Sequence, residues 1–104
     1  MKDNIYMNKS EDLSKQFNIW IAKINLFKIS RIEINLSNDE KLSLYKFYKI
    51  GKKEPLGTKP GLFNSIENAK WNAHKSVLNM TPEEGQKNYI LLAKKIISKL
   101  SIHI

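Results

Sequence analysis

Apolar residues along this chain recur every three or four positions, which is the spacing of amphipathic helices. In the last part of the chain, for example, Tyr89, Ile90 and Ala93 begin a stripe that continues to Leu100. The segment Arg31–Leu36 alternates like a short extended stretch, but no alternation lasts long enough to predict a sheet. The pattern predicts an all-α chain with helices at about residues 10–27, 37–50, 65–78 and 81–99.

Capping signals mark the starts of the second and fourth predicted helices. Ser37 and Glu40 have the spacing of a capping box, in which each side chain accepts a hydrogen bond from the other residue's backbone N–H. Thr81 and Glu84 repeat this spacing, and Pro82 stands at the first helical position, where no N–H is needed. The fourth helix consequently has the clearest start in the chain.

The other boundaries depend on charges and turn residues. Ser10 should open the first helix, because Glu11 and Asp12 then occupy the first turn, where the helix dipole favours acids. The second helix should end by Gly51, and the third should stop at Asn79, a residue that tolerates left-handed geometry. A long crossover loop between these helices is marked by Pro55, Gly57, Pro60 and Gly61.

Length and composition predict one small domain spanning residues 1–104, with 41% hydrophobic residues. The absence of cysteine excludes disulfides and thiolate metal sites. The first residues are polar and acidic too early for a signal peptide, and no apolar run is long enough to span a bilayer, so we expect a cytoplasmic protein. The net charge of +8 contains no long block of like charges, and fits a small phosphorylated ligand at least as well as a nucleic acid.

The second predicted helix carries the first candidate chemistry. Tyr45, Tyr48 and Lys49 share one helical face, with Lys46 at its edge. Aromatic rings, phenolic hydroxyls and an ammonium group within one turn suit a ligand that is both flat and phosphorylated. Taken alone, these tyrosines are better interpreted as core residues and this lysine as a solvated surface residue.

Four features in this order resemble the acyl-CoA-binding protein family. They are the Y-x-x-Y-K segment Tyr45–Lys49, the pair Pro60-Gly61, the run Ala69-Lys70-Trp71 and a tyrosine in the last helix, Tyr89. The resemblance extends from about Leu36 to about Ile97. The chain departs from the family pattern in a shorter loop after Lys49, a longer connection near Lys28–Asn35, and His74 in place of a frequent second aromatic.

The resemblance implies a four-helix bundle with up-down-down-up topology and a long Pro/Gly loop between helices two and three. It also implies that Tyr48 stacks on adenine, while Tyr45, Lys49 and Lys70 hold the ribose 3′-phosphate. Tyr89 would pack against the first helix and reach the pantetheine–acyl junction with its hydroxyl.

Two further residues have structural interpretations. We expect Trp71 to bridge the second and third helices. We expect His74 to be partly exposed, and a lone histidine without cysteine or acidic partners at ligand spacing predicts no metal site.

The sequence therefore predicts a monomeric, non-enzymatic, intracellular protein that binds long-chain fatty acyl-CoA esters and acts as buffer and carrier. No nucleophile elbow, Gly-rich phosphate loop or paired metal ligands predict catalysis, and no cofactor besides the acyl-CoA ligand is expected. Two alternatives remain: a basic helical nucleic-acid-binding domain, and a helical interaction module that keeps the fold without the ligand.

Overall fold

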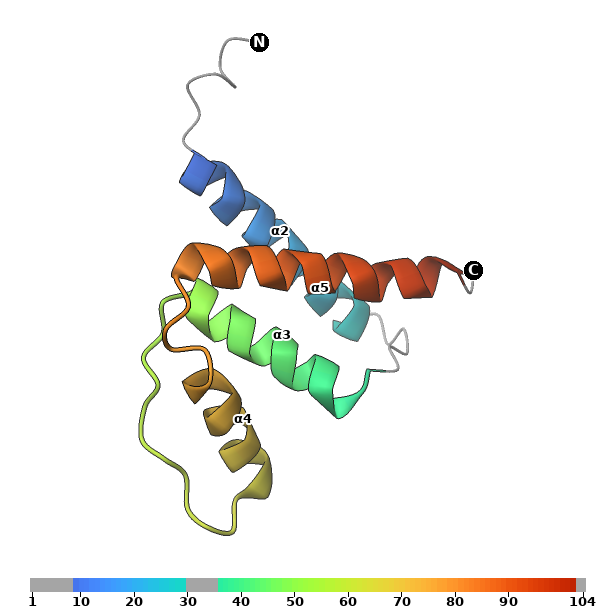
Figure 1. The fold of residues 1–104 in the computed structure, drawn as a ribbon. Coiled ribbons are helices and arrows are strands. Elements are labelled where there is room, and N and C mark those ends of the chain that lie inside the picture. Colours follow the sequence, from blue (N-terminus) through green and yellow to red (C-terminus); the bar gives the residue numbers. More distant parts are fainter. Residues whose placement is uncertain (1–8, 30–35, 103–104) are drawn as a thin grey trace.

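The computed structural model describes residues 9–29 and 36–102, which form four helices and no strand (Figure 1). The helices are α2 (Lys9–Ile29), α3 (Asn38–Gly51), α4 (Ser65–Lys75) and α5 (Pro82–Ile102). The all-α prediction is confirmed, and the chain has the up-down-down-up bundle fold. Most of the extended stretch expected near residues 31–36 lies outside the described residues.

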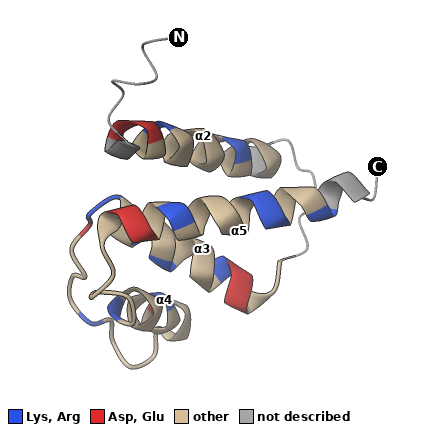
Figure 2. Cartoon of the chain, turned by 45° about the horizontal axis from the view of Figure 1, so that its top comes forward, with Lys and Arg blue, Asp and Glu red and all other residues tan. Residues whose placement is uncertain are grey.

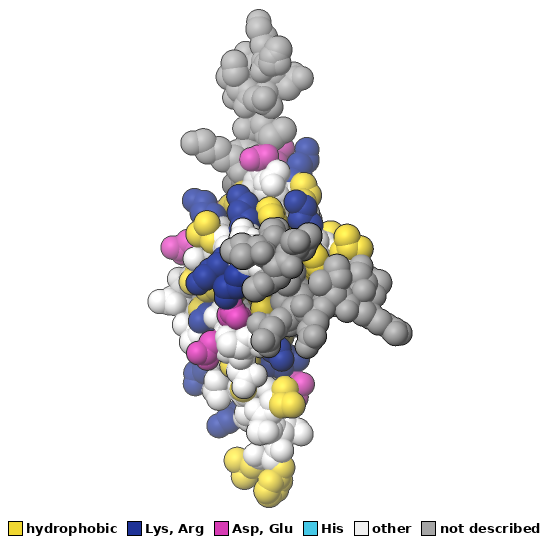
Figure 3. Space-filling view, turned by 90° about the vertical axis from the view of Figure 1, so that its right-hand side faces the viewer, with side chains coloured by type: hydrophobic (Ala, Val, Ile, Leu, Met, Phe, Trp, Pro, Cys, Tyr) yellow, Lys and Arg dark blue, Asp and Glu magenta, His cyan; other side chains and the backbone are white. Residues whose placement is uncertain are grey.

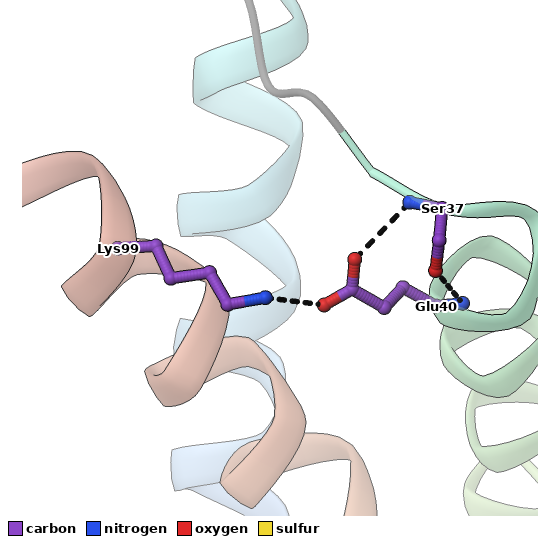
Figure 4. A network of polar contacts seen from close by, with 3 residues as sticks. All are labelled: Ser37, Glu40 and Lys99. Carbon is purple, nitrogen blue, oxygen red and sulfur yellow. Dashed lines mark hydrogen bonds and ion pairs between the residues drawn. The ribbon is translucent and has the colours of Figure 1, made fainter.

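Both predicted capping boxes are present. The Ser37 hydroxyl accepts a hydrogen bond from the Glu40 N–H, and the Ser37 N–H donates to Glu40 Oε1, each at 3.1 Å. Thr81 and Glu84 make the same pair of bonds at 2.8 and 3.1 Å. Glu40 also accepts a bond of 2.9 Å from Lys99 Nζ, so the start of α3 is tied to α5 (Figure 4).

The predicted start of the first helix and the predicted end of the third helix need correction. α2 begins at Lys9, one residue before Ser10. α4 ends at Lys75 instead of residue 78, because the chain continues through short turns in which Val77 and Leu78 donate backbone hydrogen bonds only three residues back. Asn79 does not adopt left-handed geometry, and Lys53 is the described non-glycine residue that does, with φ of 60°.

α5 is the element against which the bundle is assembled. It packs against both α2 and α3, whereas α4 packs against α3 (Figure 1). Within the described residues, the backbones of α2 and α3 make no close contact with each other. The buried core between α2, α3 and α5 consists of Phe17, Ile24, Leu44, Tyr89, Ile90, Ala93 and Ile96.

Two glycines allow α3 and α5 to approach closely. A Cβ atom on Gly85 would lie 2.9 Å from the Gly51 nitrogen and 2.9 Å from Ile50 Cγ2. A Cβ atom on Gly51 would lie 2.7 Å from Phe17 Cζ. The contact is reinforced by the buried Gln86 side chain, whose Nε2 donates to the Gly51 carbonyl at 3.1 Å. The crossing therefore has no room for side chains at either glycine.

We expect Gly85→Ala to lower the free energy of unfolding by about 1–3 kcal/mol, the usual cost of overpacking a core. The backbone of Gly51 cannot move aside as a flexible side chain could. Urea denaturation measures the change, and Ser98→Ala at an exposed position of α5 is the control, with an expected effect of at most about 0.5 kcal/mol. A Gly85→Ala variant as stable as the wild type would contradict the close crossing.

Candidate functional site

A pocket of about 920 Å³ lies between α2, α3 and α4, and Tyr89 of α5 contributes to its lining. α2 and α3 supply aliphatic side chains such as Ile21, Ile24 and Leu42. α3 and α4 supply polar and charged ones such as Lys41 and Lys70. The pocket is therefore amphipathic, with an apolar side and a cationic side.

The five candidate ligand residues occupy three helices around this pocket. Tyr45 and Tyr48 of α3, Lys70 of α4 and Tyr89 of α5 all line it. Lys49 of α3 stands next to the pocket, in contact with Tyr45, but is not part of its lining. The structure thus brings together residues that are up to 44 positions apart in the sequence, from Tyr45 to Tyr89.

Two lysines that come from different helices lie near the ring of Tyr45. The Lys49 Nζ is 5.5 Å from the centroid of the Tyr45 ring, and the Lys70 Nζ is 5.0 Å from it. Tyr45 and Lys49 are one turn apart on α3, whereas Lys70 reaches the ring from α4. Two ammonium groups and a phenolic hydroxyl at one place form a site suited to a multiply charged anion.

The sequence reasoning missed an acidic partner of Lys49. Lys49 Nζ donates a hydrogen bond of 2.6 Å to Glu54 Oε1, and this bond is the main reason that the pKa of Lys49 is raised. Lys70 has only a looser contact with Glu67, at 3.7 Å. Any anion that binds here must compete with Glu54 for Lys49.

The backbone at the end of α3 explains why Glu54 reaches Lys49. The Glu54 N–H donates to the Lys49 carbonyl and the Lys53 N–H donates to the Ile50 carbonyl, both at 3.0 Å, while Lys53 is left-handed. This is the Schellman arrangement, with lysine at the position usually held by glycine. It folds the chain back, so residues five apart become neighbours. A lysine followed five residues later by a glutamate, across the end of a predicted helix, was the sequence signal for this pair.

Tyr48 and Tyr89 belong to a cluster of aromatic rings with Phe17. Tyr89 is 4% exposed and contacts Phe17 edge to face, with 5.3 Å between centroids, which confirms that it packs against the first helix. Tyr48 lies 6.4 Å from Phe17 and 6.5 Å from Tyr89. Burial raises the pKa of Tyr89 to about 12.

His74 is buried, so the expectation that it is partly exposed was wrong. It is 2% exposed, and within the described part of the chain its Nε2 has no hydrogen-bond partner. Burial lowers the pKa of His74, and the positive charge of Lys49 lowers it further, against a smaller opposing effect from the backbone at Glu54. His74 is therefore a buried side chain that is neutral at neutral pH, although it lies close enough to Lys49 to feel its charge.

Trp71 attaches α4 to the crossover loop. Its indole Nε1 donates a hydrogen bond of 3.2 Å to the Gly57 carbonyl. Gly57 has φ of 78°, a conformation that glycine adopts without strain. We expected Trp71 to bridge the second and third helices, and its indole hydrogen bond is made to the loop that joins them.

Comparison with known proteins places the chain in a family. Residues 14–93 match the sequence model of the family described as acyl CoA binding protein, and the chain belongs to this family. It is 36% identical over 73 residues to an acyl-CoA-binding protein of Ricinus communis, covering 69% of this chain and 81% of the relative. It is 33% identical over 76 residues to the acyl-CoA-binding protein of Saccharomyces cerevisiae, covering 70% and 85%.

The fold supports the same assignment. The chain is similar to the crystal structure of acyl-CoA-binding protein 2 from Oryza sativa, with a TM-score of 0.73 and 30% sequence identity. The similarity covers 88% of this chain and 98% of the rice chain. The suspected family and its four-helix fold are thereby confirmed.

We expect the buried neutral His74 to make stability depend on pH. Its pKa in the folded protein lies below the value of 6.5 that applies when it is exposed, so the unfolded chain takes up the proton first. Stability should therefore be unaffected by His74 above that value and fall as the pH decreases toward the folded pKa. The slope is at most about 1.4 kcal/mol per pH unit for one proton.

Urea denaturation of the wild type and of His74→Phe, from about pH 8 to about pH 5, measures this effect. Other titrating groups are common to both proteins, so the difference in unfolding free energy isolates His74. A difference that stays constant over this range would show that His74 takes up its proton equally well in the folded state.

Proposed function

We propose that this protein binds long-chain fatty acyl-CoA esters without turning them over, and that it buffers and carries them in the cytoplasm. The observation that carries the proposal is the position of Tyr45 near both Lys49 and Lys70, next to an amphipathic pocket of about 920 Å³. An acyl-CoA has a phosphorylated nucleotide at one end and an apolar chain at the other, so its two ends match the two sides of the pocket. The names of the relatives agree with this ligand.

Each candidate residue has a role in this proposal. Tyr48 stacks on the adenine ring, and Tyr45, Lys49 and Lys70 hold the 3′-phosphate. The Tyr89 hydroxyl donates a hydrogen bond near the pantetheine–acyl junction. The acyl chain lies against the aliphatic side chains that α2 and α3 contribute to the pocket.

The distribution of charge favours this ligand over a nucleic acid. Lysines are spread over all four helices, with acidic residues among them, instead of gathering on one face (Figure 2). Nucleic-acid-binding domains concentrate basic residues in a patch or stripe. As for lipid bilayers, none of the described helices combines the length and the apolar character needed to cross one.

Ligand class is the first test. Calorimetry should show that long-chain acyl-CoA binds far better than the free fatty acid, because the site is proposed to bind a nucleotide and the free acid has none. Affinity should rise with acyl length by up to about 0.8 kcal/mol per buried methylene until the pocket is full, which makes free CoA a weak ligand. Equal affinity for the ester and the free acid would reject the proposal, and a flat dependence on chain length would reject the apolar groove.

The 3′-phosphate is the second test. Removing either Lys49 or Lys70 should cost about 1.5–3 kcal/mol of binding, the range for hydrogen bonds to charged groups. The wild type should bind 3′-dephospho acyl-CoA much less well than acyl-CoA, whereas the Lys49→Ala, Lys70→Ala double variant should barely distinguish the two. A double variant that discriminates as strongly as the wild type would place the phosphate elsewhere.

Glu54→Gln provides a control of opposite sign. Because Glu54 competes for Lys49, its neutralisation should strengthen the binding of acyl-CoA by up to about fivefold, the upper end of the range for solvent-accessible ion pairs, since this pair is only partly buried. The gain should disappear with the 3′-dephospho ligand. Tyr48→Ala should weaken both ligands alike through lost stacking, with little dependence on salt.

A further inference from the structure

Three large apolar side chains project into solvent where the crossover loop enters α4. Leu62 is 89% exposed, Phe63 99% and Ile66 74%, which are the highest values among the exposed large hydrophobic residues described. We call these three residues the apolar tip. Figure 3 shows hydrophobic side chains gathered at the lower end of the molecule, where this loop lies in Figure 1.

The turn that carries the apolar tip is held in place by hydrogen bonds. Asn68 Nδ2 donates to the Gly61 carbonyl at 2.7 Å and to the Asn64 carbonyl at 2.9 Å. The Asn64 N–H donates to the Gly61 carbonyl at 3.1 Å, which closes the turn around Leu62 and Phe63. The exposure of these two side chains is therefore built into the turn. Exposure of these apolar side chains to water does not stabilise the folded protein.

The apolar tip adjoins the mouth of the pocket. Ile66 belongs to the tip and also lines the pocket. Lys70 lies one turn further along α4, so a lipid in contact with Ile66 is within reach of the cationic side of the site.

The segment of the chain that carries the tip has more basic than acidic residues. Between residues 58 and 75 the chain carries Lys59, Lys70 and Lys75 and a single acid, Glu67. Apolar side chains that project between lysines are typical of proteins that dock at the surface of an anionic membrane, since the side chains enter the lipid and the lysines meet the headgroups.

We propose that the apolar tip docks into the surface of an anionic lipid bilayer, with the mouth of the pocket facing the lipid. One short turn offers much less than the roughly 1,000 Å² that a stable protein–protein interface buries, whereas shallow insertion into a bilayer needs no matching surface. Docking does not depend on the proposed function. Its use, the uptake of an acyl-CoA directly from the membrane, rests on that function.

Cosedimentation of the full chain with vesicles tests the docking. The wild type should bind vesicles of phosphatidylcholine with phosphatidylserine, and bind pure phosphatidylcholine vesicles less well. Leu62→Ser, Phe63→Ser should reduce the partition coefficient at least about tenfold, because each lost side chain removes buried apolar area. Leu91→Ser, at an exposed apolar position of α5 that does not line the pocket, should leave it unchanged.

Three outcomes would overturn the proposal: no binding of the wild type to anionic vesicles, equal binding by the tip variant, or an equal loss in Leu91→Ser. Thermal melting and calorimetry with acyl-CoA in solution show whether the tip variant is folded, since neither Leu62 nor Phe63 lines the pocket. The single variant Phe63→Ser replaces the double variant if that one does not fold. Vesicle binding without acyl-CoA binding rejects only the proposed function, and the reverse result rejects only the docking.

Discussion

The arrangement depends on α5, because the backbones of α2 and α3 both pack against it and make no close contact with each other. α5 can hold both helices because its buried face combines small and large residues, with Ala93 fully buried and Ile96 1% exposed. The glycine crossing brings α3 close to α5, and the T-shaped contact of Tyr89 with Phe17 fixes α2. The space that remains between α2, α3 and α4 is the pocket.

The lysines at this pocket already have acidic partners, and a bound anion must compete with them. Lys49 is held by Glu54, Lys70 is loosely paired with Glu67, and both ammonium groups face the ring of Tyr45. An anion with more charge than one carboxylate can displace these partners, whereas a singly charged ion gains little. The neutral His74 adds no repulsion to a site that already concentrates positive charge.

The apolar tip exposes side chains that a folded protein usually buries. A folded protein ordinarily gains from placing leucine and phenylalanine inside, yet the bonds from Asn68 hold Leu62 and Phe63 outward. These exposed side chains are the basis of the proposed docking at a lipid surface. Ile66 connects the tip with the pocket.

The sequence alone determined the features that depend on neighbours along the chain. The capping boxes at Ser37 and Thr81 were predicted correctly, because their hydrogen bonds join residues three apart. The four helices followed from the spacing of apolar residues, and the ordered motifs pointed to the family. The roles of the five candidate ligand residues remain predictions.

Only the tertiary structure decided which faces are covered and which charges meet. The burial of His74 depends on how α4 packs against the end of α3, which no local pattern encodes. The bond between Lys49 and Glu54 requires the left-handed turn at Lys53, a conformation that sequence rules assign to glycine. Burial arises between elements distant in the chain and is settled by packing, whereas the Lys49–Glu54 pair depends on a local backbone conformation that lysine seldom adopts.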